Sequence, residues 1–182
     1  AGIYKNWDQA VYDGWLDKFQ LPRNKKFKDY SRGMTMKLGI AAALSHHPRL
    51  LLLDEATGGL DPMVREELLE VFADFAAEDG HAVLLSSHIV SDLERICDYI
   101  AFLHRGRLVL CEEKDVLLAT YGILKCTREQ LANIPEEAIH GKRVGAYGVE
   151  ALVERELIPR GLTVDRANLE DIILYLVKEE KQ

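Results

Sequence analysis

Three stretches of the chain carry apolar residues at helical spacing, and we expect a helix in each. Residues 7–20 place large apolar side chains three or four positions apart, and residues 35–47 are rich in Ala and Leu and stop before Pro48. The third stretch follows Asp61 and Pro62, which are a typical N-cap and a typical first residue of a helix.

Two short runs dominated by apolar residues, 50–53 and 81–87, predict strands. Because they lack polar alternation, we expect each strand to be buried on both faces of a parallel sheet. Residues 99–103 and 108–111 flank a Gly-containing turn, which predicts a β-hairpin. Helices and strands alternating in this order predict an α/β fold with a largely parallel sheet.

The hydrophobic pattern changes beyond about residue 121. Two segments there predict strands, and the two after them predict helices. They are, in chain order, residues 123–126, 143–149, 149–157 and 168–178. We therefore expect a small α+β appendage over residues 121–182.

Composition narrows the class of protein. The chain is 48% hydrophobic and 29% charged, as expected of a soluble globular protein, and no run of about 18 apolar residues predicts a membrane span. The net charge of −7 and the pI of 5.4 argue against a nucleic-acid partner. The N-terminus has neither the apolar core of a signal peptide nor a Met, which suggests a cut or trimmed chain.

The strongest chemical feature is a pair of carboxylates, Asp54 and Glu55, directly after the first apolar strand. Open α/β sheets bind ligands at the carboxyl ends of their strands. Two adjacent carboxylates there can divide the work of phosphoryl transfer, since one can hold Mg²⁺ while the other orients or deprotonates the attacking water. Taken alone, the same pair could be two polar residues of an exit loop.

Three further motifs surround the two carboxylates. They are Tyr30-Ser31-Arg32-Gly33-Met34 before the second helix, Gly58-Gly59-Leu60-Asp61 after the first strand, and Ser86-Ser87-His88 at the end of the second strand. Ser31 is a typical helix N-cap, and the backbone N–H groups at such a helix end can bind an anion.

The order and spacing of these motifs resemble the second half of an ABC ATPase nucleotide-binding domain. Residues 30–34 resemble the ABC signature, 50–55 the Walker B strand, 59–61 the D-loop, and His88 the switch histidine. The resemblance is close over residues 7–115 and loose beyond. Four positions depart from the commonest pattern, and none of them removes a carboxylate or the histidine. These are Arg32 for Gly, Met34 for Gln, Ala56 for Pro and Gly58 for Ser.

The resemblance implies a role for three residues at the nucleotide of their own subunit. Asp54 is expected to bind Mg²⁺ through water, and Glu55 to act as the general base. His88 is expected to contact the γ-phosphate and to link it to Glu55. As single residues, His88 could instead merely open the next helix, and Ser31 could be a simple cap.

The resemblance also implies a second set of residues at the subunit interface. Ser31 and Gly33, within the signature Ser31-Arg32-Gly33-Met34, would reach the γ-phosphate held by the opposite subunit of a head-to-tail dimer. Asp61 would couple the two nucleotide sites. We therefore predict that the signature and Asp61 bind nucleotide.

The phosphate-binding motif G-x-x-x-x-G-K-[ST] does not occur in the sequence, and the single Gly-Lys pair, at Gly141, lacks the upstream Gly. The resemblance then implies a partial P-loop NTPase core whose chain begins inside the helical subdomain. We expect residues 1–47 in that subdomain, 48–120 in the ATPase core and 121–182 in the appendage. We also expect unpaired strand edges, exposed apolar surface and no activity of this chain alone.

As a function, the resemblance implies the ATP-hydrolysing subunit of an ABC transporter, with ATP and Mg²⁺ as cofactors. The Arg-Gly-Met form of the signature resembles subunits that serve exporter-type permeases. The expected partners are a membrane permease and a second ATP-binding subunit, at the cytoplasmic face of the membrane. Two alternatives remain. A soluble ABC ATPase of chromosomes or ribosomes is disfavoured by the acidic pI and by the lack of a long coiled coil, and a non-catalytic interaction fragment is the other.

Overall fold

A computed structural model describes residues 5–146 and 148–179 of the chain. It divides into two compact units, residues 1–92 and 93–182, which we describe separately. The three-part division expected from the sequence stays a prediction.

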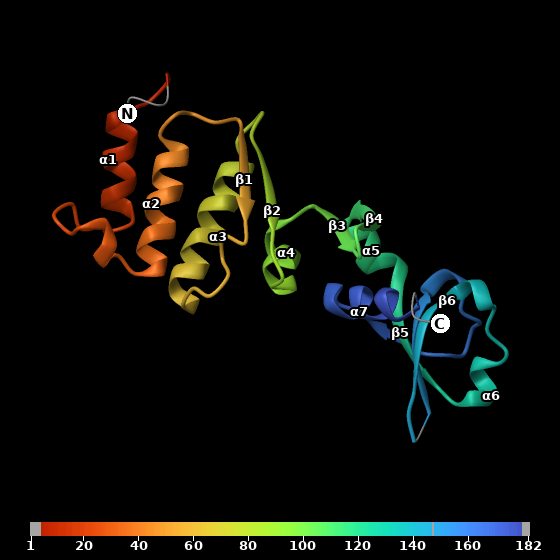
Figure 1. Cartoon of the computed structure of the whole chain (residues 1–182). Helices are drawn as coiled ribbons and strands as arrows, with labels where there is room; N and C mark the ends of the chain where they lie inside the picture. The colour runs from red at the N-terminus through yellow and green to blue at the C-terminus, as the bar shows by residue number, and fades with distance from the viewer. Residues whose placement is uncertain (1–4, 147, 180–182) are drawn as a thin grey trace. The chain divides into compact units, whose positions relative to one another are not determined.

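The N-terminal unit contains three long helices beside a pair of strands (Figure 1). Its elements are α1 (Gln9–Lys18), the 3₁₀ turn η1 (Phe27–Asp29), α2 (Arg32–Leu44), β1 (Leu50–Asp54), α3 (Pro62–Ala76) and β2 (Ala82–Ser86). Helix α4 (Val90–Ile96) begins in this unit. All three helices expected from the apolar spacing are present, although α2 begins three residues before the predicted position 35.

Each of the three long helices begins at a side chain that caps it. Asp8 accepts hydrogen bonds from the backbone N–H groups of Ala10 and Val11, at 2.9 and 3.1 Å. Ser31 accepts from the N–H of Met34 at 3.2 Å, and Asp61 from the third helical N–H of α3 at 3.1 Å. These caps satisfy N–H groups that have no partner inside the helix, so they fix where α2 and α3 start.

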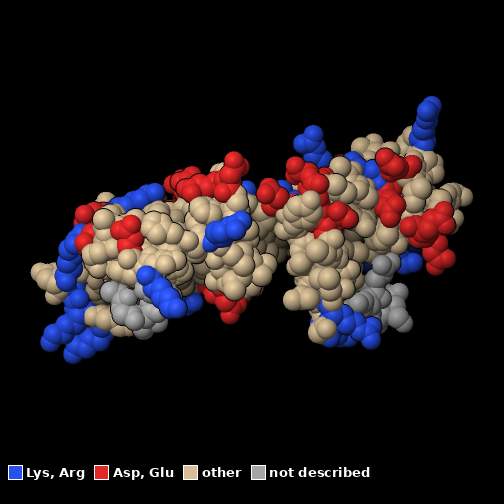
Figure 2. Space-filling view, turned by 90° about the horizontal axis from the view of Figure 1, so that it is seen from above, with Lys and Arg blue, Asp and Glu red and all other residues tan. Residues whose placement is uncertain are grey.

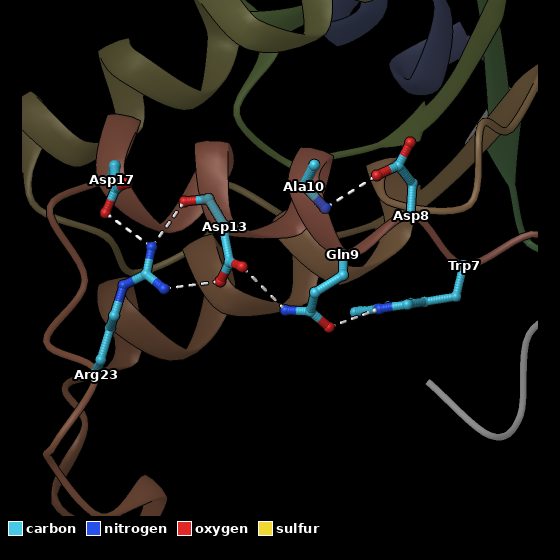
Figure 3. Close-up of polar contacts among 7 residues, drawn as sticks. All are labelled: Trp7, Asp8, Gln9, Ala10, Asp13, Asp17 and Arg23. Atoms are coloured by element: carbon cyan, nitrogen blue, oxygen red, sulfur yellow. Dashed lines mark hydrogen bonds and ion pairs between the residues drawn. The ribbon is translucent and has the colours of Figure 1, made fainter.

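The connector from α1 to α2 is tied to α1 by Arg23 (Figure 3). Its guanidinium forms ion pairs with Asp13 at 2.7 Å and with Asp17 at 3.0 Å. At the other end of the connector the hydroxyl of Tyr30 donates to the carbonyl of Pro22 at 2.8 Å. The connector is therefore closed into a loop that delivers the chain to the start of α2.

Strands β1 and β2 pair in parallel, in register from Leu50 opposite Ala82 to Asp54 opposite Ser86, which confirms the predicted parallel pairing. The prediction that both faces of these strands are covered is wrong. Leu51 and Leu53 are buried, whereas three large apolar side chains are exposed. These are Leu50 (52% exposed), Leu52 (68%) and Leu84 (65%). The apolar surface expected from the family resemblance is thus present.

The buried face of the strand pair lies toward α3, which packs beside β2 (Figure 1). Four residues of α3 are buried, and α2 packs in turn on α1. The buried side chains of α3 are Leu68, Leu69, Val71 and Phe72. This core holds β1 and the N-terminal ends of α2 and α3 in one body, because buried apolar area is the main source of folding free energy.

The C-terminal unit is an α+β arrangement with two sheets, an antiparallel hairpin and a four-stranded sheet of order β6-β7-β5-β8. Its strands are β3 (Tyr99–His104), β4 (Arg107–Glu113), β5 (Tyr121–Cys126), β6 (Ile139–Val144), β7 (Val149–Glu154) and β8 (Val164–Arg166). Its helices are α5 (Lys114–Thr120), α6 (Arg128–Leu131) and α7 (Leu169–Glu179), with 3₁₀ turns η2 (Glu136–Ala138) and η3 (Arg155–Leu157).

The predicted hairpin at β3 and β4, strand β5 and helix α7 are confirmed. The helix predicted over 149–157 is wrong, because this segment is β7 followed by the turn η3. The strand predicted over 143–149 is partly correct, because residues 143–144 end β6 and residue 149 begins β7. The two strands are separated at two glycines, where the N–H of Gly145 donates to the carbonyl of Gly148 at 2.8 Å. None of the described helices has both the length and the apolar character needed to cross a bilayer.

Candidate functional site

The two parallel strands of the N-terminal unit bring their carboxyl ends to one edge of the sheet. Asp54 at the end of β1 pairs with Ser86 at the end of β2. The Ser86 hydroxyl donates to Asp54 Oδ1 at 2.5 Å and accepts from the Glu55 N–H at 3.1 Å. One hydroxyl therefore bonds both the carboxylate of Asp54 and the backbone of Glu55.

Glu55 and His88 lie in direct contact beyond these strand ends. The distance from His88 Nδ1 to Glu55 Oε2 is 2.6 Å, and the side chains are 72% and 44% exposed, respectively. The backbone of Glu55 has a φ of +48°, which is unusual for a residue with a Cβ and costs about 1 kcal/mol or more. We call Asp54, Glu55, Ser86 and His88 the strand-end group.

Gly58 lies against this contact and is buried. A Cβ at this position would be 3.3 Å from Glu55 Oε2 and 3.6 Å from Cε1 of His88. A side chain at this position would therefore press against the carboxylate of Glu55.

The signature residues cluster at the N-terminal end of α2. Gly33 approaches the first turn of α3, because a Cβ on it would lie 3.2 Å from Val64 Cγ1. The guanidinium of Arg32 lies over Gly59, where a Cβ would be 2.5 Å from Nη1. Gly59 also has a φ of +67°, so two independent constraints favour glycine at this position.

Met34 and Asp61 complete this second cluster. The N–H of Met34 is bound by Ser31, and its Sδ lies 4.0 Å from Nζ of Lys25. Asp61 is exposed and caps α3. We call Ser31, Arg32, Gly33, Met34 and Asp61 the helix-end group. Within residues 5–146 and 148–179, no hydrogen bond or ion pair that we find joins this group to the strand-end group.

Sequence reasoning missed a buried polar cluster behind the strand-end group. The carboxylate of Asp92 accepts from the hydroxyl of Thr57 at 2.7 Å and from Nε of Arg65 at 2.7 Å. The sequence also does not indicate that Ser86 bonds the carboxylate of Asp54 and the backbone of Glu55. The single hint in the sequence is an Asp within the apolar spacing of α4, and an Asp there usually faces solvent.

The donor set at Asp54 fits Mg²⁺. In proteins Mg²⁺ is usually held by one or two carboxylates, waters and substrate phosphates rather than by a cage of side chains. Asp54 has one oxygen bonded to Ser86 and is otherwise exposed, so it can reach a hydrated ion. No group of three or more His, Cys, Asp or Glu side chains forms a metal cage in the described part of the chain.

Comparison with known proteins identifies the family. Residues 3–58 match the family model described as ABC transporter. An uncharacterized ABC transporter ATP-binding protein of Synechocystis sp. is 35% identical over 175 residues, covering 86% of this chain and 48% of that protein. The bacitracin transport ATP-binding protein of Enterococcus faecalis is 45% identical over 87 residues, covering 48% of this chain and 28% of that protein.

A third relative, the lantibiotic transport ATP-binding protein of Streptococcus pyogenes, is 44% identical over 88 residues, which cover 48% of this chain and 38% of that protein. The chain thus spans between 28% and 48% of the length of these three relatives.

Solved structures agree with the sequence relatives. The ATP-binding subunit of an ABC transporter superposes with a TM-score of 0.53 at 34% identity, covering 60% of this chain and 48% of that one. A dimeric ATP-binding cassette in a post-hydrolysis state, with ADP and phosphate bound, gives a TM-score of 0.50 at 25% identity. It covers 55% of this chain and 44% of that one. The four motifs, the shared P-loop NTPase fold and these relatives agree, and this chain belongs to the ABC transporter ATP-binding family.

Proposed function

We propose that this chain is the C-terminal part of an ATP-binding subunit that hydrolyses ATP to drive transport through a separate membrane permease. The observation that carries the proposal is the 2.6 Å contact between Glu55 and His88 beside Asp54, at the carboxyl ends of two parallel strands. Open α/β sheets bind their ligands at this edge.

The strand-end group divides the work of hydrolysis. Asp54 would hold Mg²⁺ through water, and a bound Mg²⁺ would supply positive charge beside the phosphates. Glu55 is the general base for the attacking water, and His88 orients its carboxylate and contacts the γ-phosphate. An exposed pair suits these roles, because both side chains must be reachable by water and nucleotide.

The helix-end group serves a nucleotide held by a second ATP-binding subunit. Ser31, Arg32 and Gly33 present a helix N-terminus and a cation, a combination that attracts phosphate. The Arg32 guanidinium makes no hydrogen bond or ion pair with the described residues, so its donors are available to a ligand. Its contact with Gly59 joins the signature to the loop that leads to Asp61.

The names of the relatives indicate what kind of transporter the subunit serves. Two of them are named for bacitracin and lantibiotic transport. We infer an exporter-type permease as partner and a peripheral position at the cytoplasmic face of the membrane. Acidic and basic side chains are interspersed over both units on the face in Figure 2, whereas nucleic-acid-binding proteins commonly present a continuous basic patch.

We also propose that these 182 residues do not bind ATP measurably by themselves. In this family a Gly-rich loop and a Lys hold the phosphates, and each charge-assisted hydrogen bond contributes about 1.5–3 kcal/mol. Losing three or four such bonds weakens a micromolar site beyond the millimolar range. Calorimetric titration with ATP and Mg²⁺ tests this, and a micromolar dissociation constant would show that the chain contains a phosphate cradle of its own.

The proposed function is tested by replacing the histidine. In the complete subunit, His88→Ala should lower the rate of ATP hydrolysis by about 10²–10⁴-fold, as expected when a group that assists proton transfer is lost. The matched control is His47→Ala, because His47 is also exposed and also contacts a carboxylate, that of Asp8. Hydrolysis at the wild-type rate in His88→Ala would contradict the proposal.

A further inference from the structure

Asp92 is a buried charge that the proposed chemistry does not use. Its side chain is 2% exposed, and it is the single charged residue among the fully buried side chains of the described chain. It lies on α4, four residues after His88. A buried carboxylate is costly unless it is paired and hydrogen-bonded, so its partners have to explain its presence.

Both oxygens of Asp92 are occupied, and each by a different segment. Oδ2 accepts from the Thr57 hydroxyl at 2.7 Å. Oδ1 accepts from Arg65, whose Nε lies at 2.7 Å and whose Nη2 makes a second bond to the same oxygen. Nη2 also donates to the hydroxyl of Ser91 at 3.1 Å. The carboxylate therefore joins the loop after β1, the first turns of α3 and the start of α4.

Two short turns connect the buried bond between Thr57 and Asp92 to the exposed contact between Glu55 and His88. Thr57 follows Glu55 by two residues in a buried turn closed by the N–H of Gly58 on the Glu55 carbonyl at 3.1 Å. On the other side, the N–H of Asp92 donates to the carbonyl of Ile89 at 3.0 Å. Both turns are short and closed by a hydrogen bond, so we expect a shift of Asp92 relative to Thr57 to move His88 relative to Glu55.

The exposed pair needs such support. An ion pair open to solvent contributes little by itself, because water screens the charges and both side chains lose rotamer freedom. The side chains of Glu55 and His88 are both exposed, yet Nδ1 and Oε2 lie 2.6 Å apart. The carboxylate of Asp92, by contrast, is shielded from solvent. It accepts a hydrogen bond from Thr57, in the loop that carries Glu55, and its own backbone N–H is bonded to Ile89, next to His88.

We propose that Asp92 is a positioning residue that holds His88 within hydrogen-bond distance of Glu55. The expected effect of Asp92 on the rate of hydrolysis rests on the proposed function, whereas its effect on the position of His88 does not. Because Asp92 is buried, it acts through Thr57 and the α4 turn. Arg65 serves it by balancing its charge and by anchoring it to α3.

The test is Asp92→Asn in the complete subunit. The amide keeps the shape and can still accept from Thr57, but it no longer carries the charge that faces Arg65. We expect the kcat for ATP hydrolysis to fall by about 10- to 100-fold, the cost of misplacing a catalytic group by about 1 Å, while KM changes little. We also expect the ¹⁵N chemical shift of His88 Nδ1 to move toward that of an imidazole without a carboxylate partner.

Two further variants complete the experiment. Thr57→Val removes one hydrogen bond and keeps the pair of Asp92 with Arg65, so it should change kcat and the His88 shift in the same direction by less. It also provides the test if Asp92→Asn does not fold. Asp74→Asn, at an exposed position of α3, removes an equal charge and should leave both readouts unchanged.

The outcomes separate this inference from the proposed function. A variant with a lower melting temperature but an unchanged kcat and an unchanged His88 shift would make Asp92 a structural residue only and overturn the inference. If the wild-type subunit hydrolyses no ATP while the His88 shift still responds to Asp92→Asn, the positioning contact stands and the proposed function fails.

Discussion

His88 Nδ1 lies 2.6 Å from Glu55 Oε2, although 33 residues separate the two along the chain. The contact exists because β1 and β2 are parallel and in register, so that their carboxyl ends deliver both side chains to the same edge. It also needs the positive φ of Glu55, which turns the chain sharply after Asp54. The proposed division of work between Glu55 and His88 depends on this contact.

Gly59 should not tolerate a side chain. Gly59→Ala introduces a Cβ at a φ of +67° and places it 2.5 Å from Nη1 of Arg32. The backbone strain alone should destabilise the fold by about 1–2 kcal/mol, measured by urea unfolding. The double variant Arg32→Ala with Gly59→Ala should regain the part that is due to the guanidinium.

Gly39→Ala is the control for this substitution. Gly39 lies in the interior of α2 and has no neighbour within 4 Å of an added Cβ. Replacement should therefore stabilise the helix by about 0.5–1 kcal/mol. Equal effects at the two glycines would show that neither the left-handed backbone nor Arg32 restricts position 59.

Truncation of two neighbouring leucines of β1 should change the free energy of unfolding by very different amounts. Leu51 is 3% exposed, so Leu51→Ala should lower the free energy of unfolding of the chain by about 2–5 kcal/mol. Leu52 is 68% exposed, and Leu52→Ala should change the free energy of unfolding by no more than about 0.5 kcal/mol. Chemical unfolding of both variants gives the comparison, and a large cost at Leu52 would mean that the second face of the strand pair is covered.

The same exposed face should promote self-association. Leu52 and Leu84 lie side by side in register on β1 and β2, and both are exposed. Apolar surface next to unpaired strand edges favours contact with other molecules. Leu52→Lys should therefore reduce the apparent mass of the chain in sedimentation, and a wild-type chain that is already monomeric at high concentration would argue against this reading.

Stability should depend on the ionisation of Asp8 at acid pH. The N–H of Val11, and next the ring of His47, hold the pKa of the Asp8 carboxyl below its ordinary value of 3.8. A pKa that is lower in the folded state means that the charge stabilises the fold above pH 3.8 and that this contribution is lost as pH falls through the lowered pKa.

Asp8→Asn isolates this charge, because Asn caps helices about as well as Asp. The wild-type chain should be more stable than Asp8→Asn at pH 6, and the difference should vanish in strong acid. Urea unfolding of both chains across the pH range measures this difference in stability. Asp29→Asn, at an exposed position of the turn η1, removes an equal charge and is the matched control. A difference between wild type and Asp8→Asn that is independent of pH would contradict this assignment.

Local chemistry was enough to predict much of the N-terminal unit. The Asp61-Pro62 pair and Ser31 mark helix starts through bonds within a few residues, so both caps were readable from the sequence. The end of β1 was equally clear, because a carboxylate pair interrupts an apolar run. These signals are short-range, and they therefore do not depend on the rest of the fold.

The features that the sequence did not predict depend on contacts between residues far apart along the chain. The bond from Thr57 to Asp92 spans 35 residues, and no local pattern announces that an Asp will be buried. The segment of β7 has buried residues at 149, 151, 152 and 153, a run that suits a helix as well as a strand until β5 and β6 pair with it. The exposed face of β1 was misjudged because a continuous apolar run does not reveal which side is covered.

The most direct test of the account is the rate of ATP hydrolysis by the Glu55→Gln variant of the complete subunit. Gln keeps the size of the side chain and can still accept a hydrogen bond from His88, but it cannot take a proton from water. We predict that ATP still binds and that hydrolysis falls by about 10²–10⁴-fold, while Glu70→Gln, at an exposed position of α3, has no effect. Turnover by Glu55→Gln at the wild-type rate would contradict the assignment of Glu55 as the base.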